Sequence, residues 1–392
     1  MRKLIAALIG TCVALTASAA FLMVDGHRGQ APPAPGGGDA PEYISGLADF
    51  NLVELAPSST MASITPAGHS GSTAGVIAAW SGGAKGAGYR LFVHGGGHGD
   101  SSNNGLYIFD YRGTTEPAGW ATPLEISDAS DIVADSCIYS DDRPTASHTY
   151  DGQFYARGVN AVYRFAGTVW QEANFADCAW KYDLGTGEWS QLTDFPGGSG
   201  GAVSFYDEAS GKAFVVNATE LDGYFFDTTT DTWAGASDTV SGGLQETGCG
   251  YDDSRTRGVC VGGNSLRVIT FDWSAETVSV ATGSMTGDTD IVGGKISTVY
   301  DPELDLFWLL GGGAGSAGWS NIYEMNADGT ASSQRTLIEH ALSGTVEQDG
   351  GMQGSYGRWA RLEGEDETPW RAIGTIADVD TGAYLIKLPE VP

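Results

Sequence analysis

Residues 91–111 read LFVHGGGHGDSSNNGLYIFDY, and this stretch indicates the fold of the whole chain. An apolar run, Leu91–Val93, leads to three glycines at 95–97, and a polar loop then connects to a second apolar run, Leu106–Phe109. Short apolar runs separated by glycines and polar residues are typical of neighbouring β-strands. Weaker copies of the pattern recur along the chain, so we expect a repeated β-unit.

The composition favours an all-β chain. The 392 residues include 58 Gly, 11 Trp, 16 Tyr and 14 Phe, while charged residues make up 18%. Many glycines with regularly spaced aromatics are typical of short strands joined by tight turns. The formal net charge of −29 argues against nucleic acid and anionic membranes as partners.

The N-terminus predicts export. Residues 1–24 begin with two cations, continue as the uncharged stretch Leu4–Val24 and include a small-residue cleavage pattern. A cleaved signal peptide is preferred, and an uncleaved membrane anchor is the alternative because 21 uncharged residues nearly span a bilayer. In both cases the domain is exported to the periplasm or beyond, and membrane contact is confined to this segment. Residues 25–47, rich in Pro and Gly, are predicted to be a linker to a domain at 48–392.

Four cysteines follow the N-terminal segment, and an even number in an exported chain favours disulfides. Cys249 and Cys260 flank a polar turn and would face each other in a hairpin, so we expect them to pair. Cys137 and Cys178 then pair by elimination.

The repeated unit has two apolar strands, a third ending in Asp or Asn, and often a fourth carrying Trp. Six units can be traced, with first strands expected at Val76–Trp80, His148–Tyr155, Ala202–Tyr206, Gly248–Asp252, Ile296–Asp301 and Tyr356–Leu362. The last unit lacks a fourth strand, whereas the apolar run Leu52–Leu55 has no unit of its own. We expect this run to complete the last unit and close a ring, which removes exposed sheet edges. The repeat spacing of about 40–50 residues matches propeller blades; six blades is the preferred count and seven the alternative.

Several segments resemble kelch motifs. They include Val93–Gly97 followed by Leu106–Asp110 and Trp120, and Leu309–Gly313 followed by Ile322-Tyr323. More closely, the chain resembles a group of bacterial and phage kelch-like proteins, often labelled galactose-oxidase-like and mostly uncharacterised. The shared segments are Gly95–Asp100, Ser147–Tyr150 and Tyr356–Trp359. The resemblance covers residues 48–390 and implies an all-β, kelch-type β-propeller.

In such a propeller, the loop between the second and third strands lies on the same face as the start of the first strand. This rule places a set of polar and aromatic residues on one rim: His69, His98, Asp100, Asn104, Arg143, His148, Tyr150, Glu246, Tyr356, Arg358 and Trp359. Convergent polar groups in a concavity are the default site hypothesis. We assign catalytic roles to His98, His148, Tyr150 and Arg358, and substrate contacts to the others.

Structural alternatives exist for several of these residues. His94 lies within a strand and is expected to pack between blades, His98 can simply cap its glycine turn, and Arg358 can bridge to neighbouring acids. His148 and Tyr150 alternate along one expected strand, so both would face the channel. No metal site is predicted, because the His94 and His98 spacing is weak support for one; calcium at acidic turns is an open alternative.

Two classes of function fit this rim. In a polysaccharide lyase-like enzyme, Arg358 or Arg143 would neutralise a sugar carboxylate. His148 or Tyr150 would remove a proton, and His98, or whichever of His148 and Tyr150 is not the base, would return one. A galactose-oxidase-type copper enzyme is disfavoured, because the cysteines are assigned to disulfides. The alternative is a non-catalytic module for glycan or protein partners, in which exposed Trp319 and Trp359 stack on sugar faces.

Overall fold

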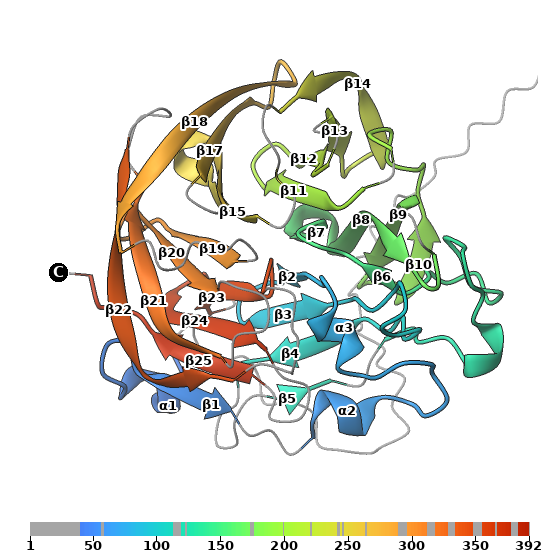
Figure 1. Cartoon of the computed structure of the whole chain (residues 1–392), viewed down its shortest axis with the longest axis horizontal. Helices are drawn as coiled ribbons and strands as arrows, with labels where there is room; N and C mark the ends of the chain where they lie inside the picture. Colours follow the sequence, from blue (N-terminus) through green and yellow to red (C-terminus); the bar gives the residue numbers. More distant parts are fainter. Residues whose placement is uncertain are drawn as a thin grey trace, which may run out of the picture. The chain divides into compact units, whose positions relative to one another are not determined.

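The structure is a computed structural model, and the residues that it describes all lie within Gly37–Pro392. The residues described are 40–55, 59–112, 119–121, 124–172, 176–198, 200–219, 222–240, 244, 247–262, 265–288, 296–311, 318–327, 334–347, 355–364, 367–377 and 383–391. The predicted signal or anchor at 1–24 and most of the predicted linker lie outside them. Within these ranges the chain is all-β, with a propeller-like arrangement of four small sheets and one eight-stranded sheet (Figure 1).

The first sheet contains the stretch that opened the sequence analysis. Its strand order is β2 (Gly83–Lys85), β3 (Arg90–Val93), β4 (Tyr107–Asp110) and β5 (Gly119–Trp120). The prediction that Val76–Trp80 is the first strand is wrong, because this run forms helix α3 (Gly75–Ala78) and Gly83–Lys85 takes the strand position. A short apolar run suits a buried helical turn as well as a strand, so its pattern does not distinguish the two.

The second and third sheets follow the expected order along the chain. The second contains β6 (Ser147–His148), β7 (Gln153–Ala156), β8 (Ala161–Val169), β9 (Ala176–Asp183) and β10 (Glu188–Gln191). The third contains β11 (Ala202–Asp207), β12 (Lys212–Asn217), β13 (Asp222–Asp227) and β14 (Thr232–Thr239). The expected strand His148–Tyr155 is thus two strands, β6 and β7, separated by a turn.

The largest sheet joins two antiparallel meanders edge to edge. One consists of β15 (Gly248–Asp252), β16 (Arg257–Gly262), β17 (Ser265–Asp272) and β18 (Thr277–Gly287). The other consists of β19 (Ile296–Asp301), β20 (Leu306–Gly311), β21 (Trp319–Asn326) and β22 (Arg335–Val346). β18 pairs in parallel with β22 through Met285–Gly287, and at the other end Thr298 Oγ1 of β19 donates to the Gly248 carbonyl of β15 at 3.2 Å. The sheet is therefore nearly closed, and its hydrogen bonding does not divide it into separate blades.

The last sheet brings the two ends of the described chain together. Its order is β1 (Leu52–Leu55), β25 (Ala383–Lys387), β24 (Pro369–Ile376) and β23 (Trp359–Glu363), and β1 pairs antiparallel with β25. The expected completion of the last sheet by Leu52–Leu55 is confirmed. The helix α1 (Glu42–Ser45) precedes β1 within the stretch predicted to be linker, and Ile44 is fully buried.

Short helical turns complete the described chain, and the two expected disulfides are present. The turns are α2 (Met61–Ile64) and the 3-10 helices Ala129–Asp131, Arg157–Val159 and Asp253–Arg255. Cys137 is bonded to Cys178, and Cys249 is bonded to Cys260 across neighbouring strands β15 and β16. The described residues contain no helix that is long and apolar enough to cross a membrane.

Separate apolar cores lie between neighbouring sheets, and one lies between the two meanders of the eight-stranded sheet. Taken in order from the last sheet and the first, representative residues that share a core are Leu385 and Tyr107, Phe92 and Val162, Phe165 and Phe226, Phe214 and Phe271, Val268 and Leu309, and Trp308 and Trp359. A further core around Cys178 and Trp180 packs the second sheet against residues 137 and 138. The strands nearest the middle line a common cavity of about 400 Å³, to which β2, β7, β11, β15, β19 and β23 all contribute.

Candidate functional site

A glycine turn positions His98 on the rim. Gly96 and Gly97 have φ values of 85° and 83°, and His98 itself has a φ of 44°. A Cβ on Gly97 would lie 2.3 Å from the Thr168 carbonyl oxygen, so only glycine lets the turn pack against β8. The His98 amide then donates to the Val169 carbonyl at 2.9 Å. The predicted rim loop is thus attached to the neighbouring sheet.

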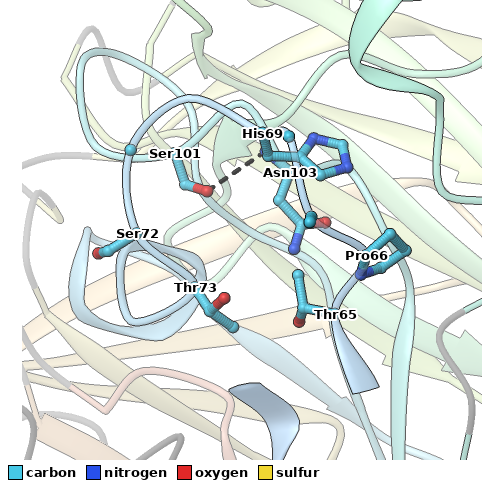
Figure 2. Close-up of a pocket in the computed structure, with 10 residues that line it drawn as sticks. Thr65, Pro66, His69, Ser72, Thr73, Ser101 and Asn103 are labelled. Carbon is cyan, nitrogen blue, oxygen red and sulfur yellow. Dashed lines mark hydrogen bonds between the residues drawn. The ribbon is translucent and has the colours of Figure 1, made fainter. Parts of the chain in front are cut away.

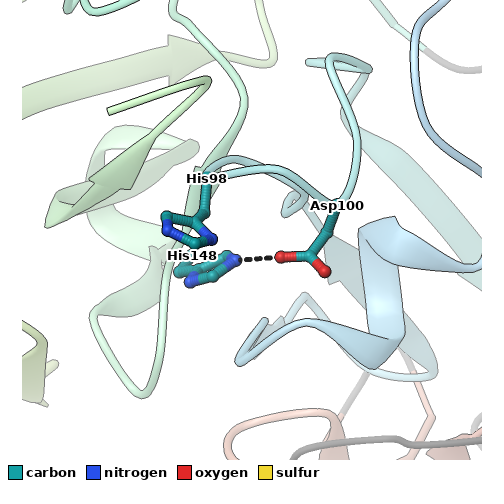
Figure 3. A group of neighbouring side chains, drawn as sticks. All are labelled: His98, Asp100 and His148. Atoms are coloured by element: carbon teal, nitrogen blue, oxygen red, sulfur yellow. Dashed lines mark hydrogen bonds and ion pairs between the residues drawn. The ribbon is translucent and has the colours of Figure 1, made fainter. Parts of the chain in front are cut away.

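His98, Asp100 and His148 form the centre of the site (Figure 3). The His148 Nε2 and Asp100 Oδ2 atoms are 2.8 Å apart, and the His98 and His148 ring centroids are 5.6 Å apart. One ligand-type atom from each residue lies within 4.8 Å of the other two. His148 is buried, Asp100 is partly exposed and His98 faces solvent. Burial lowers the pKa of His148, and the hydrogen bond with Asp100 partly opposes that effect.

Aromatic side chains surround this cluster. The His148 ring lies 5.2 Å from the ring of Trp80 and 6.4 Å from that of Tyr150, and Tyr150 lies 5.9 Å from Tyr356. Trp80, Tyr150 and Tyr356 all have positive φ values, of 45°, 47° and 37°. Positive φ is unfavourable for bulky residues and tends to concentrate at functional sites. Trp80 was not among the predicted rim residues, because the sequence placed it at the end of a strand.

Tyr150 lies beside the cluster, but a turn positions it and not the predicted strand. It does not continue the strand of His148, because β6 ends at His148 and Tyr150 lies in the turn before β7. The Tyr150 amide donates to the Trp80 carbonyl at 2.7 Å. A Cβ on Gly82 would lie 1.8 Å from the Tyr150 carbonyl oxygen, so the two turns are in tight contact. The strand alternation of His148 and Tyr150 is wrong, although their rings are neighbours.

The predicted arginines are engaged elsewhere in the protein. Arg143 pairs with Glu125 Oε2 at 2.7 Å and with Asp141 Oδ2 at 2.9 Å. Arg358 is fully buried and donates to the carbonyl of Ile77. Each guanidinium therefore has a hydrogen-bond partner outside the His98–Asp100–His148 cluster.

Other predicted contact residues are separated from the cluster by burial or position. Asn104 is buried, and its amide nitrogen donates to Ser127 Oγ at 2.8 Å and to the Pro144 carbonyl at 2.7 Å. Trp319 and Trp359 are 7% and 4% exposed and belong to the core between the eight-stranded sheet and the last sheet. Their predicted exposure is wrong, since these indoles fill the space between sheets. Glu246 lies outside the described residues.

His69 occupies a second pocket near the rim (Figure 2). This pocket has a volume of about 200 Å³ and is lined by residues 65–69, 71–73, 101 and 103. Burial lowers the pKa of His69, with a smaller opposing contribution from the Ser102 backbone. The segment lies beside Asp100, whose carbonyl accepts from the Ser72 amide at 3.2 Å. His69 is not a member of the three-residue cluster.

His94 is a packing residue, as expected. It is fully buried, and its ring makes an edge contact with Trp189 at a centroid separation of 5.5 Å. In the sequence, His94 and His98 were the only two histidines whose spacing suggested a pair of metal ligands. The fold instead combines His98 with His148, which lies 50 positions further along the chain.

Asp151 is a buried acid that sequence reasoning missed. It lines the central cavity, is 7% exposed, and its Oδ2 accepts from the Cys249 amide at 3.2 Å. Burial raises the pKa of this carboxyl to about 7, while the Cys249 hydrogen bond opposes the shift. No motif or spacing in the sequence identifies Asp151. Its burial depends on how β7, β11 and β15 pack together, and these strands lie far apart in the sequence.

Asp151 gives a pH-dependent stability. The pKa of its carboxyl is about 7 in the folded state and 3.8 for an ordinary Asp, as in the unfolded chain, so its stabilising contribution is complete below pH 3.8 and is lost as pH rises through 7. We expect Asp151→Asn to have little effect near pH 4 and to stabilise the protein by about 2 kcal/mol at pH 8, roughly half the full displacement because the cavity can admit water. Urea unfolding at both pH values measures this. An equal effect at both pH values would contradict the prediction.

The three central side chains offer two kinds of chemistry. An Asp carboxylate hydrogen-bonded to an imidazole orients the ring for proton transfer. Two imidazoles and a carboxylate are also donors that divalent transition ions accept.

Comparisons with known proteins leave the family unassigned. The chain matches no protein-family model, and no curated protein matches its sequence. Among solved structures, it is similar to one described as "Structure of YjhT", with 13% sequence identity, a TM-score of 0.48, and coverage of 80% of this chain and 94% of that chain. A likeness of this size carries no argument about function.

Proposed function

We propose that this protein is an exported, six-bladed, kelch-type β-propeller that acts on glycans at the His98–Asp100–His148 cluster. Six of the apolar cores pack one four-stranded group against the next and support the blade count, whereas the core around Cys178 and Trp180 packs the second sheet against residues 137 and 138. On this interpretation the eight-stranded sheet is two blades whose outer strands pair through Met285–Gly287. Two disulfides are consistent with an extracellular location.

The observation that carries the functional proposal is the 2.8 Å contact between His148 and Asp100, with His98 beside it. A carboxylate only accepts hydrogen bonds, so Nε2 of His148 carries the proton and Nδ1 keeps the basic lone pair. The ring of Trp80, which is only partly buried next to the pair, provides apolar surface of the kind that sugar faces contact, whereas the neighbouring ring of Tyr150 is buried.

The proposed reaction is a β-elimination on an acidic polysaccharide. His148 takes the proton from the carbon next to the sugar carboxylate, and the electron pair of that bond forms a carbon–carbon double bond. The glycosidic carbon–oxygen bond breaks, and exposed His98 gives a proton to the departing oxygen. Asp100 holds His148 in position and stabilises the imidazolium that forms.

A non-catalytic glycan-binding module is the second candidate. It is favoured by the positions of Arg143 and Arg358, because the first is paired with two carboxylates and the second is bonded to a backbone carbonyl. An eliminating enzyme for acidic sugars needs positive charge at the substrate carboxylate, and both arginines are engaged by other groups of the protein.

Turnover on a polysaccharide panel separates the two candidates. The purified full-length protein is incubated with acidic and neutral polysaccharides, and unsaturated ends and new reducing ends are measured. We expect product from acidic substrates and a loss of about 10²- to 10⁴-fold in rate for His148→Ala. The matched control is His340→Ala, which removes a different His–carboxylate pair, with Glu324 at 3.0 Å. Binding without product would favour the module, and neither binding nor product would refute glycan action.

A further inference from the structure

The His98–Asp100–His148 cluster has the dimensions of a small cation site. The closest pair of donor atoms, in His148 and Asp100, is 2.8 Å apart, and all three donors lie within 4.8 Å of one another. A tetrahedral ion with bonds of about 2.0–2.1 Å holds its ligand atoms roughly 3.3 Å apart. That spacing falls within the observed range, so small side-chain rotations are enough to admit an ion. Figure 3 shows the three side chains turned toward one another from two separate segments.

Close packing and a hydrogen bond fix the backbone around the cluster in the ligand-free protein. A Cβ on Gly167 would lie 2.0 Å from the His148 carbonyl oxygen, so β8 packs very closely against β6, the strand that carries His148. The His98 turn is attached to the same strand through the Val169 carbonyl. Rigid elements of this kind keep metal ligands in position. Within the described part of the chain, the Asp100 carboxylate pairs with the His148 imidazole.

We infer that His98, Asp100 and His148 bind one divalent first-row transition ion. Two imidazole nitrogens with one carboxylate oxygen suit such ions, whereas Ca²⁺ and Mg²⁺ prefer sites built from oxygen alone. Three protein ligands leave at least one position for water or a substrate oxygen, and the exposed side of His98 is where it would open. The ion would bring positive charge to the cluster.

This inference is independent of the proposed reaction, because binding is measured without substrate. An ion bound to Nε2 of His148 would leave the ring proton on Nδ1, which then has no basic lone pair, so the metal-bound site and the site with a basic His148 are alternative states. Turnover with and without added ion therefore tells which state is active, and failure of one proposal leaves the other standing.

Zinc binding to the chelator-treated full-length protein tests the site. Calorimetry with Zn²⁺ alone is expected to show one ion per chain, with no binding of Ca²⁺ at the same concentrations. His98→Asn removes an exposed imidazole, and Asn tolerates the left-handed backbone that His98 adopts, so this variant is expected to fold. We expect its zinc affinity, and that of Asp100→Asn, to fall by about 100-fold.

His340→Ala is the matched control, since His340 and Glu324 form a His–carboxylate pair that is not part of the three-residue cluster. Its zinc affinity should equal that of the unaltered protein. Co²⁺ gives a second readout, because ligation by the cluster produces a visible d–d absorption that His98→Asn abolishes. Absence of zinc binding, or equal affinity of His98→Asn and the unaltered protein, would overturn the inference.

Discussion

Replacing Arg371 with methionine is expected to lower the free energy of unfolding by about 3–5 kcal/mol. Arg371 of β24 contacts both carboxylate oxygens of Asp301 at 2.9 Å, and Asp301, at the end of β19, is fully buried. Trp308 Nε1 also donates to Asp301 at 3.1 Å, and Arg371 Nε donates to the Pro389 carbonyl at 2.8 Å. Methionine preserves much of the packing volume but leaves the Asp301 charge buried without its main partner. The substitution also removes the guanidinium that links the eight-stranded sheet to the last sheet through Asp301.

Urea unfolding measures this effect. Two further variants test whether it comes from the buried charge of Asp301. In the double variant Arg371→Met with Asp301→Asn, the buried charge is absent, so much of the lost stability should return. Arg90→Met removes a surface pair with Asp110, whose atoms are 3.8 Å apart, and should cost less than about 1 kcal/mol. If Arg371→Met is no more destabilising than Arg90→Met, the buried pair does not hold these sheets together.

A charge at Leu55 is expected to be at least as damaging. Leu55 is 2% exposed, pairs with Ala383, and packs in the core between the last sheet and the first. Leu55→Asp loses about 2–3 kcal/mol of apolar burial and also places a carboxyl group in that core. We expect a total loss above about 4 kcal/mol, a large part of the stability of an ordinary domain.

Hydrogen exchange on β25 shows whether the damage follows from ring closure. The amides of β25 that pair with β1 should lose protection in Leu55→Asp before those of β20 do. If that variant does not fold, Leu55→Ala, expected to cost about 2–5 kcal/mol, gives the same comparison. Glu54→Gln, on the exposed face of the same strand, should change little. Uniform loss of protection throughout the chain would contradict a specific closing role for β1.

Much of the sheet framework could be predicted because it depends on local patterns. Strands Gly248–Asp252 and Ile296–Asp301 were placed with the observed bounds, since apolar residues and flanking turn residues define both. The Cys249–Cys260 disulfide followed from two cysteines on either side of one turn. The strand predicted at Val76–Trp80 was wrong, because a short apolar run is compatible with a helix or a strand and the residues packed around it determine which one forms.

The candidate site was predicted only in part. His98 and Asp100 share one loop with a glycine signal, and the shared-face rule brought His148 to the same rim. The position of each arginine depended on partners far along the chain, such as Ile77 for Arg358. The burial of Trp319 and Trp359 likewise depended on how two sheets pack, which strand patterns do not specify.

The all-β class, the succession of short strands, the strand that completes the last sheet and the disulfide pairs could all be derived from the amino-acid sequence. These features rest on periodicity, turn chemistry and the count of strands and cysteines, all of which are read along the chain. The meeting of His98, Asp100 and His148, the burial of Asp151 and the partners of Arg143 and Arg358 became known only from the folded structure. Side-chain contacts of this kind join residues from different sheets, so they are set by how the sheets pack and not by any spacing in the sequence.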